Sequence, residues 1–184
     1  MLVIKWIVFV LGTIGILWVS RASLRDVHHH GFYRFLSWQS ILILFVLNVN
    51  YWIFDPFSFD QIISWIFLMI SLALIFLGVR EFRRKGSIDR NRPDSALVGV
   101  EKTTQLVTTG VYQTIRHPFY SSLLFLGWGI LLKSIDVLTV ILALANTVLL
   151  VMTAQKEEQE NIAYFGENYR VYMKHSKMFI PYIF

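Results

Sequence analysis

Cysteine is absent from the 184 residues of the chain. Its absence excludes disulfides, thiolate catalysis, and zinc or iron–sulfur sites with cysteine ligands. Charged residues make up only 16% of the sequence, whereas 55% of the residues are hydrophobic. This composition is too apolar for an ordinary soluble domain. The sequence also has no glycine-rich loop between a strand and a helix, so a Rossmann-type cofactor site is unsupported.

The hydrophobic residues gather in five long runs, and a helix needs roughly 20 mostly apolar residues to cross a bilayer. No small-residue cleavage pattern follows the first run, so we expect it to remain as a permanent span. The fourth run is short and is expected to form a tight helical hairpin with the fifth. The predicted spans are Leu2–Val19, Phe35–Phe54, Ile62–Val79, Phe119–Leu132 and Val137–Thr153.

Positive charge is distributed unevenly between the predicted loops. Fifteen of the 17 lysines and arginines lie in the first loop, in residues 80–116 or in the C-terminal tail, and the second loop, residues 55–61, has none. The positive-inside rule then places the N-terminus outside, and the basic loops and C-terminus in the cytoplasm. The net charge of +5 indicates contact with membrane lipids rather than nucleic acid, because the cations are spread over juxtamembrane loops.

A polar segment of close to forty residues precedes the fourth hydrophobic run, and such a length favours function over disorder. Proline favours the first turn of a helix, so Pro118 is expected to open this helix and His117 to cap it. The free N–H groups at the start of this helix, with Arg116 beside them, are predicted to form a binding site for a carboxylate or phosphate. The alternative is that Arg116 and His117 only reach toward the membrane interface.

Two adjacent carboxylates lie on the helix that continues the fifth run past the membrane surface. Helical spacing places Glu157 on one face with Asn161 and turns Glu158 toward another. This helix is expected to stop at Gly166, and an amphipathic helix follows over Glu167–Lys174. Together with Arg116 to Pro118 and the rings of Tyr112 and Tyr120, the carboxylates predict a cytoplasmic pocket for a zwitterion with an additional cation. The alternative is that they form a solvated helix face.

Three consecutive histidines, His28, His29 and His30, are the other feature that suggests a ligand site. Their side chains cannot all point one way on a regular element, and the sequence places no acidic or histidine partner at ligand spacing. We therefore expect a loop at the level of the lipid headgroups and no metal.

The C-terminal half carries a set of motifs in a defined order. They are the run Gln105 to Tyr112, the run Arg116 to Tyr120, the pair Glu157-Glu158, then Phe165-Gly166, Tyr169, Tyr172 and Pro181. This set closely resembles the integral-membrane methyltransferases of the isoprenylcysteine carboxyl methyltransferase and phospholipid methyltransferase superfamily. The resemblance covers residues 98–181 and implies S-adenosylmethionine as cofactor. It also implies a helical bundle with a helical hairpin packed under the cofactor.

The resemblance also implies roles for single residues. The cofactor-binding positions are Thr104, Gln105, Leu106, Val107, Tyr112, His117, Pro118, Phe119, Tyr120 and Glu157. The catalytic candidates are Arg116, Tyr120 and Glu158. The fold expected is an all-α integral membrane protein with about five transmembrane helices, the C-terminal hairpin and a cytoplasmic amphipathic helix. Residues 1–184 then form one membrane domain, with three N-terminal helices in 1–79 and the cofactor loop, hairpin and catalytic segment in 80–184.

The activity implied is methyl transfer to a lipophilic acceptor that enters from the bilayer. The acceptor is a small molecule or lipidated substrate: an isoprenylcysteine-type carboxylate or thiol, or a phospholipid amine. Ser122 stands where many relatives have glycine, and Thr153 stands where eukaryotic prenylcysteine enzymes have arginine, which weakens a prenylcysteine substrate. Two other classes stay open, namely an NADPH-dependent membrane reductase of related fold and a non-catalytic scaffold or lipid-binding protein.

Overall fold

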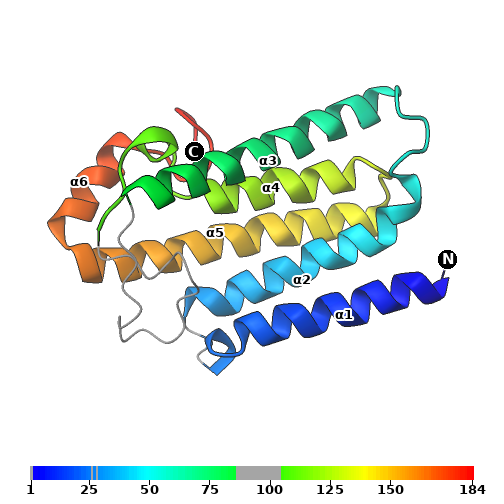
Figure 1. Cartoon of the computed structure of the whole chain (residues 1–184), viewed down its shortest axis with the longest axis horizontal. Coiled ribbons are helices and arrows are strands. Elements are labelled where there is room, and N and C mark those ends of the chain that lie inside the picture. Colours follow the sequence, from blue (N-terminus) through cyan, green and yellow to red (C-terminus); the bar gives the residue numbers. More distant parts are fainter. Residues whose placement is uncertain (1, 26, 28, 86–104) are drawn as a thin grey trace.

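The computed structural model describes residues 2–25, 27, 29–85 and 105–184, and these residues are mainly helical (Figure 1). The α-helices are α1 Leu2–Ser20, α2 His30–Asn48, α3 Phe59–Lys85, α4 Pro118–Leu131, α5 Val137–Phe165 and α6 Glu167–His175. Short 3-10 segments are η1 Ser23–Arg25, η2 Val49–Tyr51 and η4 Gly110–Gln113. The prediction of an all-α protein is confirmed.

Four of the described helices, α1, α2, α3 and α5, are long and apolar enough to cross a membrane. The fourth hydrophobic run forms α4, which has only 14 residues. At 1.5 Å per residue it is about 21 Å long, shorter than the hydrocarbon core of about 30 Å. The structure therefore has four helices of spanning length and a shorter apolar helix where the sequence predicted five spans. The integral-membrane class is confirmed.

The helices lie side by side along the long axis of the molecule, with the N-terminus at one end and α6 at the other (Figure 1). α4 and α5 form the predicted hairpin. Its turn is fixed by a capping box, in which the Asp136 carboxylate accepts the Leu138 and Thr139 N–H groups at 2.8 and 3.0 Å. The Thr139 hydroxyl accepts the Asp136 N–H in return, at 3.0 Å. These bonds satisfy backbone groups that a helix start leaves without partners.

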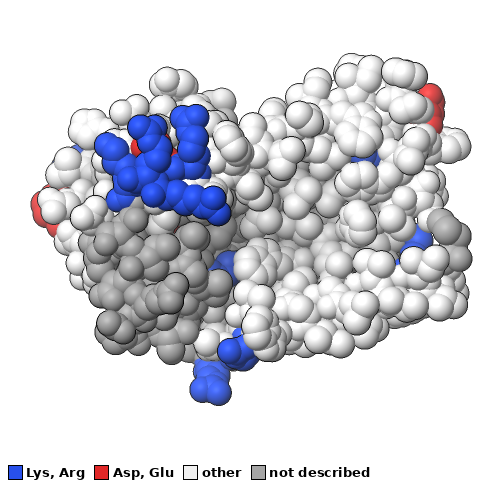
Figure 2. Space-filling model, viewed as in Figure 1, with Lys and Arg blue, Asp and Glu red and all other residues white. Residues whose placement is uncertain are grey.

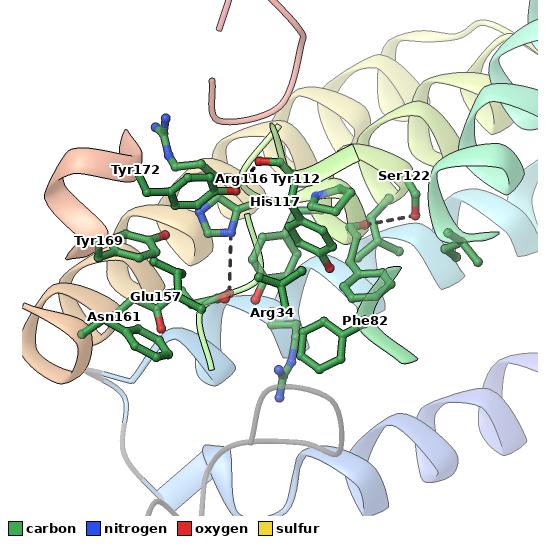
Figure 3. Close-up of a pocket in the computed structure, with 18 of the residues that line it drawn as sticks. Arg34, Phe82, Tyr112, Arg116, His117, Ser122, Glu157, Asn161, Tyr169 and Tyr172 are labelled. Atoms are coloured by element: carbon green, nitrogen blue, oxygen red, sulfur yellow. Dashed lines mark hydrogen bonds and ion pairs between the residues drawn. The ribbon is translucent and has the colours of Figure 1, made fainter. Parts of the chain in front are cut away.

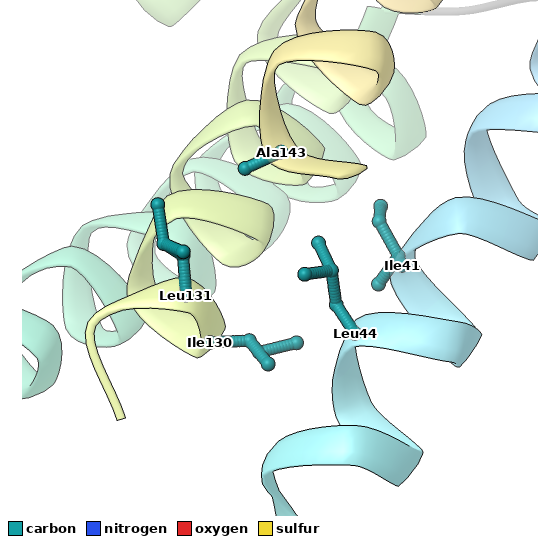
Figure 4. Close-up of a cluster of buried hydrophobic side chains, with 5 residues drawn as sticks. All are labelled: Ile41, Leu44, Ile130, Leu131 and Ala143. Atoms are coloured by element: carbon teal, nitrogen blue, oxygen red, sulfur yellow. The ribbon is translucent and has the colours of Figure 1, made fainter. Parts of the chain in front are cut away.

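The interior of the bundle combines a small apolar core with hydrogen bonds between helices. Ile41, Leu44, Ile130, Leu131 and Ala143 form one buried cluster from α2, α4 and α5 (Figure 4). Around it, the Ser37 hydroxyl donates to the Asn146 side-chain oxygen at 2.6 Å, the Asn48 amide donates to the Ile130 carbonyl at 2.8 Å, and the Ser64 hydroxyl donates to the Gly129 carbonyl at 2.6 Å. In a bilayer such contacts join helices where lipid supplies no hydrophobic driving force.

The second helix begins earlier than the hydrophobic run indicates. The predicted span starts at Phe35, but α2 starts at His30, where the His29 side chain accepts the Gly31 N–H and caps the helix. Arg34 was counted with the first loop and instead lies inside α2, where it is 1% exposed. The first turn of α2 thus becomes part of the interior at the end of the bundle that contains the candidate site.

Candidate active site

The start of α4 has the predicted form, with Pro118 in the first turn and His117 at the N-cap. The His117 imidazole makes no capping bond; it stacks on the Tyr120 ring with 5.5 Å between centroids. The C-terminal segment secures this turn, because the Arg116 N–H donates to the Lys177 carbonyl at 2.7 Å and the His117 N–H donates to the Met178 carbonyl at 3.2 Å. The first-turn N–H groups of α4 are therefore held in a fixed orientation beside an aromatic pair.

Arg116 and Glu158 form a buried ion pair next to this helix start. The Arg116 Nε donates to a Glu158 carboxylate oxygen at 2.6 Å, and its Nη1 donates to the Met173 carbonyl at 3.3 Å and to the Ser176 carbonyl. The same Glu158 oxygen lies 3.3 Å from the Nε2 atom of His117. The positive charge of Arg116, which the sequence predicted would bind an anion, is therefore already neutralised by Glu158 inside the protein. The ion pair also connects the start of α4 to α5, and the carbonyl contacts of Arg116 connect it to α6 and to the residue that follows α6.

Glu157 points to a different side of α5, as the helical spacing predicts. Its carboxylate lies 3.9 Å from the Nδ1 atom of His117 and remains 22% exposed (Figure 3). Burial and the nearby charge of Glu157 raise the pKa values of the Tyr112 and Tyr169 phenols well above their usual range. Both phenols therefore stay protonated, and their rings form aromatic walls of the site.

These side chains surround a cavity of about 440 Å³, within the range of small-molecule sites. The lining residues are Arg34, Trp38, Ile75, Phe82, Gln105, Leu106, Val107, Tyr112, Arg116, His117, Pro118, Phe119, Tyr120, Ser122, Leu123, Glu157, Asn161, Phe165, Tyr169 and Tyr172 (Figure 3). Thr104 lies outside the described residues; every other residue predicted to bind the cofactor lines this cavity. Of the catalytic candidates, Arg116 and Tyr120 line it, whereas Glu158 lies outside the set of described lining residues.

The η4 segment places Tyr112 at the cavity through a close contact with α3. Gly110 opens η4 at a φ of +61°, and a Cβ there would lie 2.8 Å from the Glu81 carboxylate. The Thr109 hydroxyl donates to this carboxylate at 2.5 Å. The Tyr172 hydroxyl, on α6, donates to the Tyr112 carbonyl at 2.6 Å. Glycine is needed here both for the backbone angle and for the approach of Glu81.

The N-terminal helices contribute more to the cavity than the sequence indicated. Arg34 and Trp38 enter from α2, and Ile75 and Phe82 enter from α3. None of the site residues predicted from the sequence lies in these two helices. One usable signal was present: Arg34 and Trp38 are four residues apart and so share a helix face. This spacing was not used, because the hydropathy pattern placed Arg34 outside the predicted second span, which begins at Phe35.

Ser122 and Thr153, the two positions at which the resemblance predicted a departure from the family pattern, each donate a hydroxyl hydrogen bond within their own helix. The Ser122 hydroxyl donates to the Phe119 carbonyl at 3.0 Å while the residue lines the cavity. The Thr153 hydroxyl donates to the Leu149 carbonyl at 2.7 Å, and Thr153 is fully buried. Neither hydroxyl is arranged as a free group toward a ligand.

The expectation that the histidine run has no acidic partner is wrong. The Nδ1 atom of His30 lies 2.5 Å from a Glu160 carboxylate oxygen, and the Nε2 atom of His29 lies 3.6 Å from it. The fold brings together residues 130 positions apart, which local spacing cannot reveal. His30 also starts α2 rather than lying in a loop, and His28 lies outside the described residues. Because His30 is bonded directly to Glu160, this group joins the start of α2 to α5.

The fold and site together define an α-helical membrane protein with a cofactor-sized cavity at one end of the bundle. The family model described as phospholipid methyltransferase matches residues 68–168, which is more than half of the chain. The chain therefore belongs to the phospholipid methyltransferase family, and the resemblance seen in the motifs is confirmed. The matched range includes the whole of α4 and α5, and with α5 the carboxylate pair.

Two curated relatives are methanethiol S-methyltransferases. The one from Pseudomonas deceptionensis is 27% identical over 151 residues, covering 74% of this chain and 55% of the relative. The one from Crocosphaera subtropica is 32% identical over 79 residues, covering 41% of this chain and 29% of the relative. The chain thus spans about half, or less, of the length of these relatives. No solved structure matches the chain.

Proposed function

We propose that the protein transfers a methyl group from S-adenosylmethionine to a lipophilic acceptor in the membrane. One observation carries the proposal: the described residues predicted to bind this cofactor line a single cavity although they come from a loop, α4 and α5. Membership of the phospholipid methyltransferase family supports the same reaction class. The scaffold alternative gives no reason for a cavity lined by this set of polar and aromatic groups.

The chemistry of the cavity fits the cofactor group by group. The exposed edge of the Glu157 carboxylate suits an ammonium, and the first-turn N–H groups of α4, after Pro118, suit a carboxylate. The rings of Tyr112 and Tyr120 suit a sulfonium, because aromatic faces attract cations. Arg116 contributes indirectly: its bond to Glu158 holds the turn in place.

When bound, S-adenosylmethionine supplies a methyl group activated by its positively charged sulfur. The contribution of the chain is to hold the acceptor in line with that group and to exclude water. Tyr112 and Tyr169 do not act as bases in this scheme, since burial and Glu157 keep their phenols protonated.

A thiol is the acceptor that we favour among the carboxylate, thiol and amine alternatives. Both relatives reported above are named methanethiol S-methyltransferases. A phospholipid amine must lose a proton before it reacts, and the candidate relay Glu158 is engaged with Arg116 and His117. A thiolate needs no such relay at the moment of transfer. The apolar helices around the cavity suit a thiol that partitions into the bilayer.

The cofactor assignment is tested by titrating the purified protein in detergent with S-adenosylhomocysteine. We expect saturable binding that weakens at least about tenfold in Glu157→Gln, because one ion pair to the ligand ammonium is lost. Glu167→Gln is the matched control, since its side chain is 72% exposed on α6. Absence of saturable binding, or equal binding by both variants, would rule out the assignment. Competition by NADPH for the same site would favour the reductase alternative.

The enzymatic assignment is tested separately with membranes and a labelled methyl donor. Label is expected in an added alkyl thiol and not in the phospholipid fraction. Label that appears in phospholipid would identify an amine acceptor instead. If the protein binds S-adenosylhomocysteine and labels neither fraction, the non-catalytic alternative is favoured.

A further inference from the structure

The last turns of α3 carry a cluster of exposed positive charge at the cavity end of the bundle. Arg80, Arg83 and Arg84, which we call the arginine cluster, are all exposed, and the side chain of Arg84 is 65% exposed. Figure 2 shows lysine and arginine side chains gathered at this end of the visible face. Glu81 is the only acidic residue in this stretch of the sequence, and it is 5% exposed. The surface of these turns is therefore strongly positive.

The cluster continues the side of α3 that is exposed along the apolar part of the helix. Met69, Leu72 and Phe76 are 63%, 61% and 63% exposed. Arg80 and Arg83 follow them at the same spacing of three or four residues and so share their face. With 27 residues α3 is about 40 Å long, whereas the hydrocarbon core is about 30 Å thick. The excess length allows the arginines to lie among lipid headgroups while the apolar part crosses the core.

The opposite face of the same turns supports the candidate site. The Glu81 carboxylate accepts the Thr109 hydroxyl at 2.5 Å and lies against Gly110, where η4 begins. The Phe82 ring has its centroid 6.4 Å from that of Tyr112, and both rings line the cavity. The position of the Tyr112 wall therefore depends on the end of α3.

Arg84 connects the two faces. Its Nη1 atom lies 4.0 Å from the Oε2 atom of Glu81, the carboxylate that holds the Thr109 hydroxyl. Like charges three or four positions apart destabilise a helix, and Arg80, Arg83 and Arg84 have this spacing. An anion bound between the guanidinium groups removes this repulsion and stabilises the turn that holds η4.

We propose that the arginine cluster binds the phosphate of an anionic phospholipid, whose acyl chains lie along the exposed apolar side of α3. Guanidinium groups suit phosphate because they offer paired N–H donors. A negatively charged headgroup is favoured over a zwitterionic one, in which a choline cation offsets the phosphate. Occupation of the site stabilises η4 and so strengthens cofactor binding. The coupling to the cofactor rests on the proposed function, whereas the lipid site does not.

The lipid site is tested with photoactivatable phosphatidylglycerol and phosphatidylcholine, added to vesicles that contain the full chain. Each basic residue near an anionic surface contributes roughly a fivefold gain in binding. We therefore expect phosphatidylglycerol to crosslink to residues 69–85 at least about fivefold more than phosphatidylcholine, as mapped by mass spectrometry. The triple variant Arg80→Gln, Arg83→Gln, Arg84→Gln should lose this preference. Arg25→Gln, which removes an exposed cation from η1 on the opposite side of the bundle (Figure 1), should keep it.

The coupling is tested by titrating S-adenosylhomocysteine into protein in vesicles of phosphatidylcholine alone and of an equal mixture with phosphatidylglycerol. The mixture should tighten binding at least about fivefold, and S-adenosylhomocysteine should raise phosphatidylglycerol crosslinking by the same factor, because coupling between sites is reciprocal. The triple variant should bind equally in both vesicles. Thr109→Val, which removes the bond to Glu81, should keep the lipid preference and lose most of the coupling.

The outcomes separate this inference from the proposed function. If S-adenosylhomocysteine binds in neither vesicle, the proposed function fails and the coupling with it, while a crosslinking preference lost in the triple variant still establishes the lipid site. Equal crosslinking of the two lipids overturns the lipid site. A preference without any change in S-adenosylhomocysteine affinity overturns the coupling. If glycerol phosphate or an RNA oligonucleotide tightens binding equally in phosphatidylcholine, the cluster binds soluble anions and the inference is overturned.

Discussion

Arg116 and Glu158 are two oppositely charged residues whose side chains are each only 9% exposed. Taking charges out of water costs several kcal/mol per ion, and the cost is recovered only where partners are close and hydrogen-bonded. The 2.6 Å bond between them and the carbonyl contacts of Arg116 meet this condition. The ion pair therefore stabilises the fold at the edge of the cavity. Removing either charge leaves the other buried without its partner.

We expect Arg116→Ala and Glu158→Ala each to lower the free energy of unfolding by about 3–5 kcal/mol. The double variant should cost less than the sum of the two, because no charge is then left alone. Unfolding of the detergent-solubilised protein by denaturant, followed by circular dichroism, measures the four members of this cycle.

The matched control for this cycle is the surface pair of Arg170 and Glu167, which are 4.0 Å apart and 61% and 72% exposed. Replacing Glu167 by alanine should change stability by no more than about 0.5 kcal/mol. Strictly additive losses at Arg116 and Glu158 would show that the two charges do not depend on each other.

At the scale of elements, the C-terminal segment after α6 shapes the start of α4. Lys177 forms an isolated bridge with Ile115, and the Ser121 hydroxyl donates to the Phe179 carbonyl at 2.8 Å. Phe179 itself is 1% exposed and packs with Tyr120 in a buried cluster. The segment thus fixes both the backbone and one aromatic wall of the candidate site.

Phe179→Ala is expected to destabilise the protein by about 3–5 kcal/mol, the usual cost of removing a buried aromatic ring. It should also weaken S-adenosylhomocysteine binding, because Tyr120 and His117 lose the surface that supports them. Tyr182→Ala, at a residue 86% exposed in the same segment, should change neither quantity. Thermal unfolding and ligand titration check both variants, and an unchanged affinity in Phe179→Ala would separate this segment from the site.

The helix boundaries that were predicted best from the sequence are those set by a single residue at the boundary itself. Pro118 opens α4 and Gly166 ends α5, as the preferences of proline and glycine indicate. The start of α2 was missed because its first five residues include histidine and arginine, and hydropathy averages cannot detect a polar stretch that is buried by packing. The pairing of Arg116 with Glu158 was also missed, since it joins residues 42 positions apart through tertiary structure. The candidate cofactor residues were identified by motif, and their common cavity follows only from the fold.

At the scale of the whole molecule, charge and apolar surface are separated along the bundle. Figure 2 shows lysine and arginine side chains gathered toward one end of the visible face, while most of the remainder is uncharged. The last turn of α3 contributes Arg83, Arg84 and Lys85. Apolar side chains of α1 such as Trp6, Leu11 and Trp18 are more than half exposed, as expected for a helix that faces lipid. This distribution favours an orientation with the cavity end on the cytoplasmic side.

The orientation can be measured directly, because the chain contains no cysteine and single cysteines can be introduced. Phe57, 87% exposed in the connection before α3, lies on the side predicted to be outside, and the exposed Lys174 in α6 lies on the side predicted to be cytoplasmic. In intact cells a membrane-impermeant maleimide should label Phe57→Cys and not Lys174→Cys. After permeabilisation both should react, and the cysteine-free chain should remain unlabelled throughout. The reverse pattern in intact cells would place the cavity on the outer side, where intracellular S-adenosylmethionine does not reach it, and would contradict both the orientation and the proposed use of this cofactor.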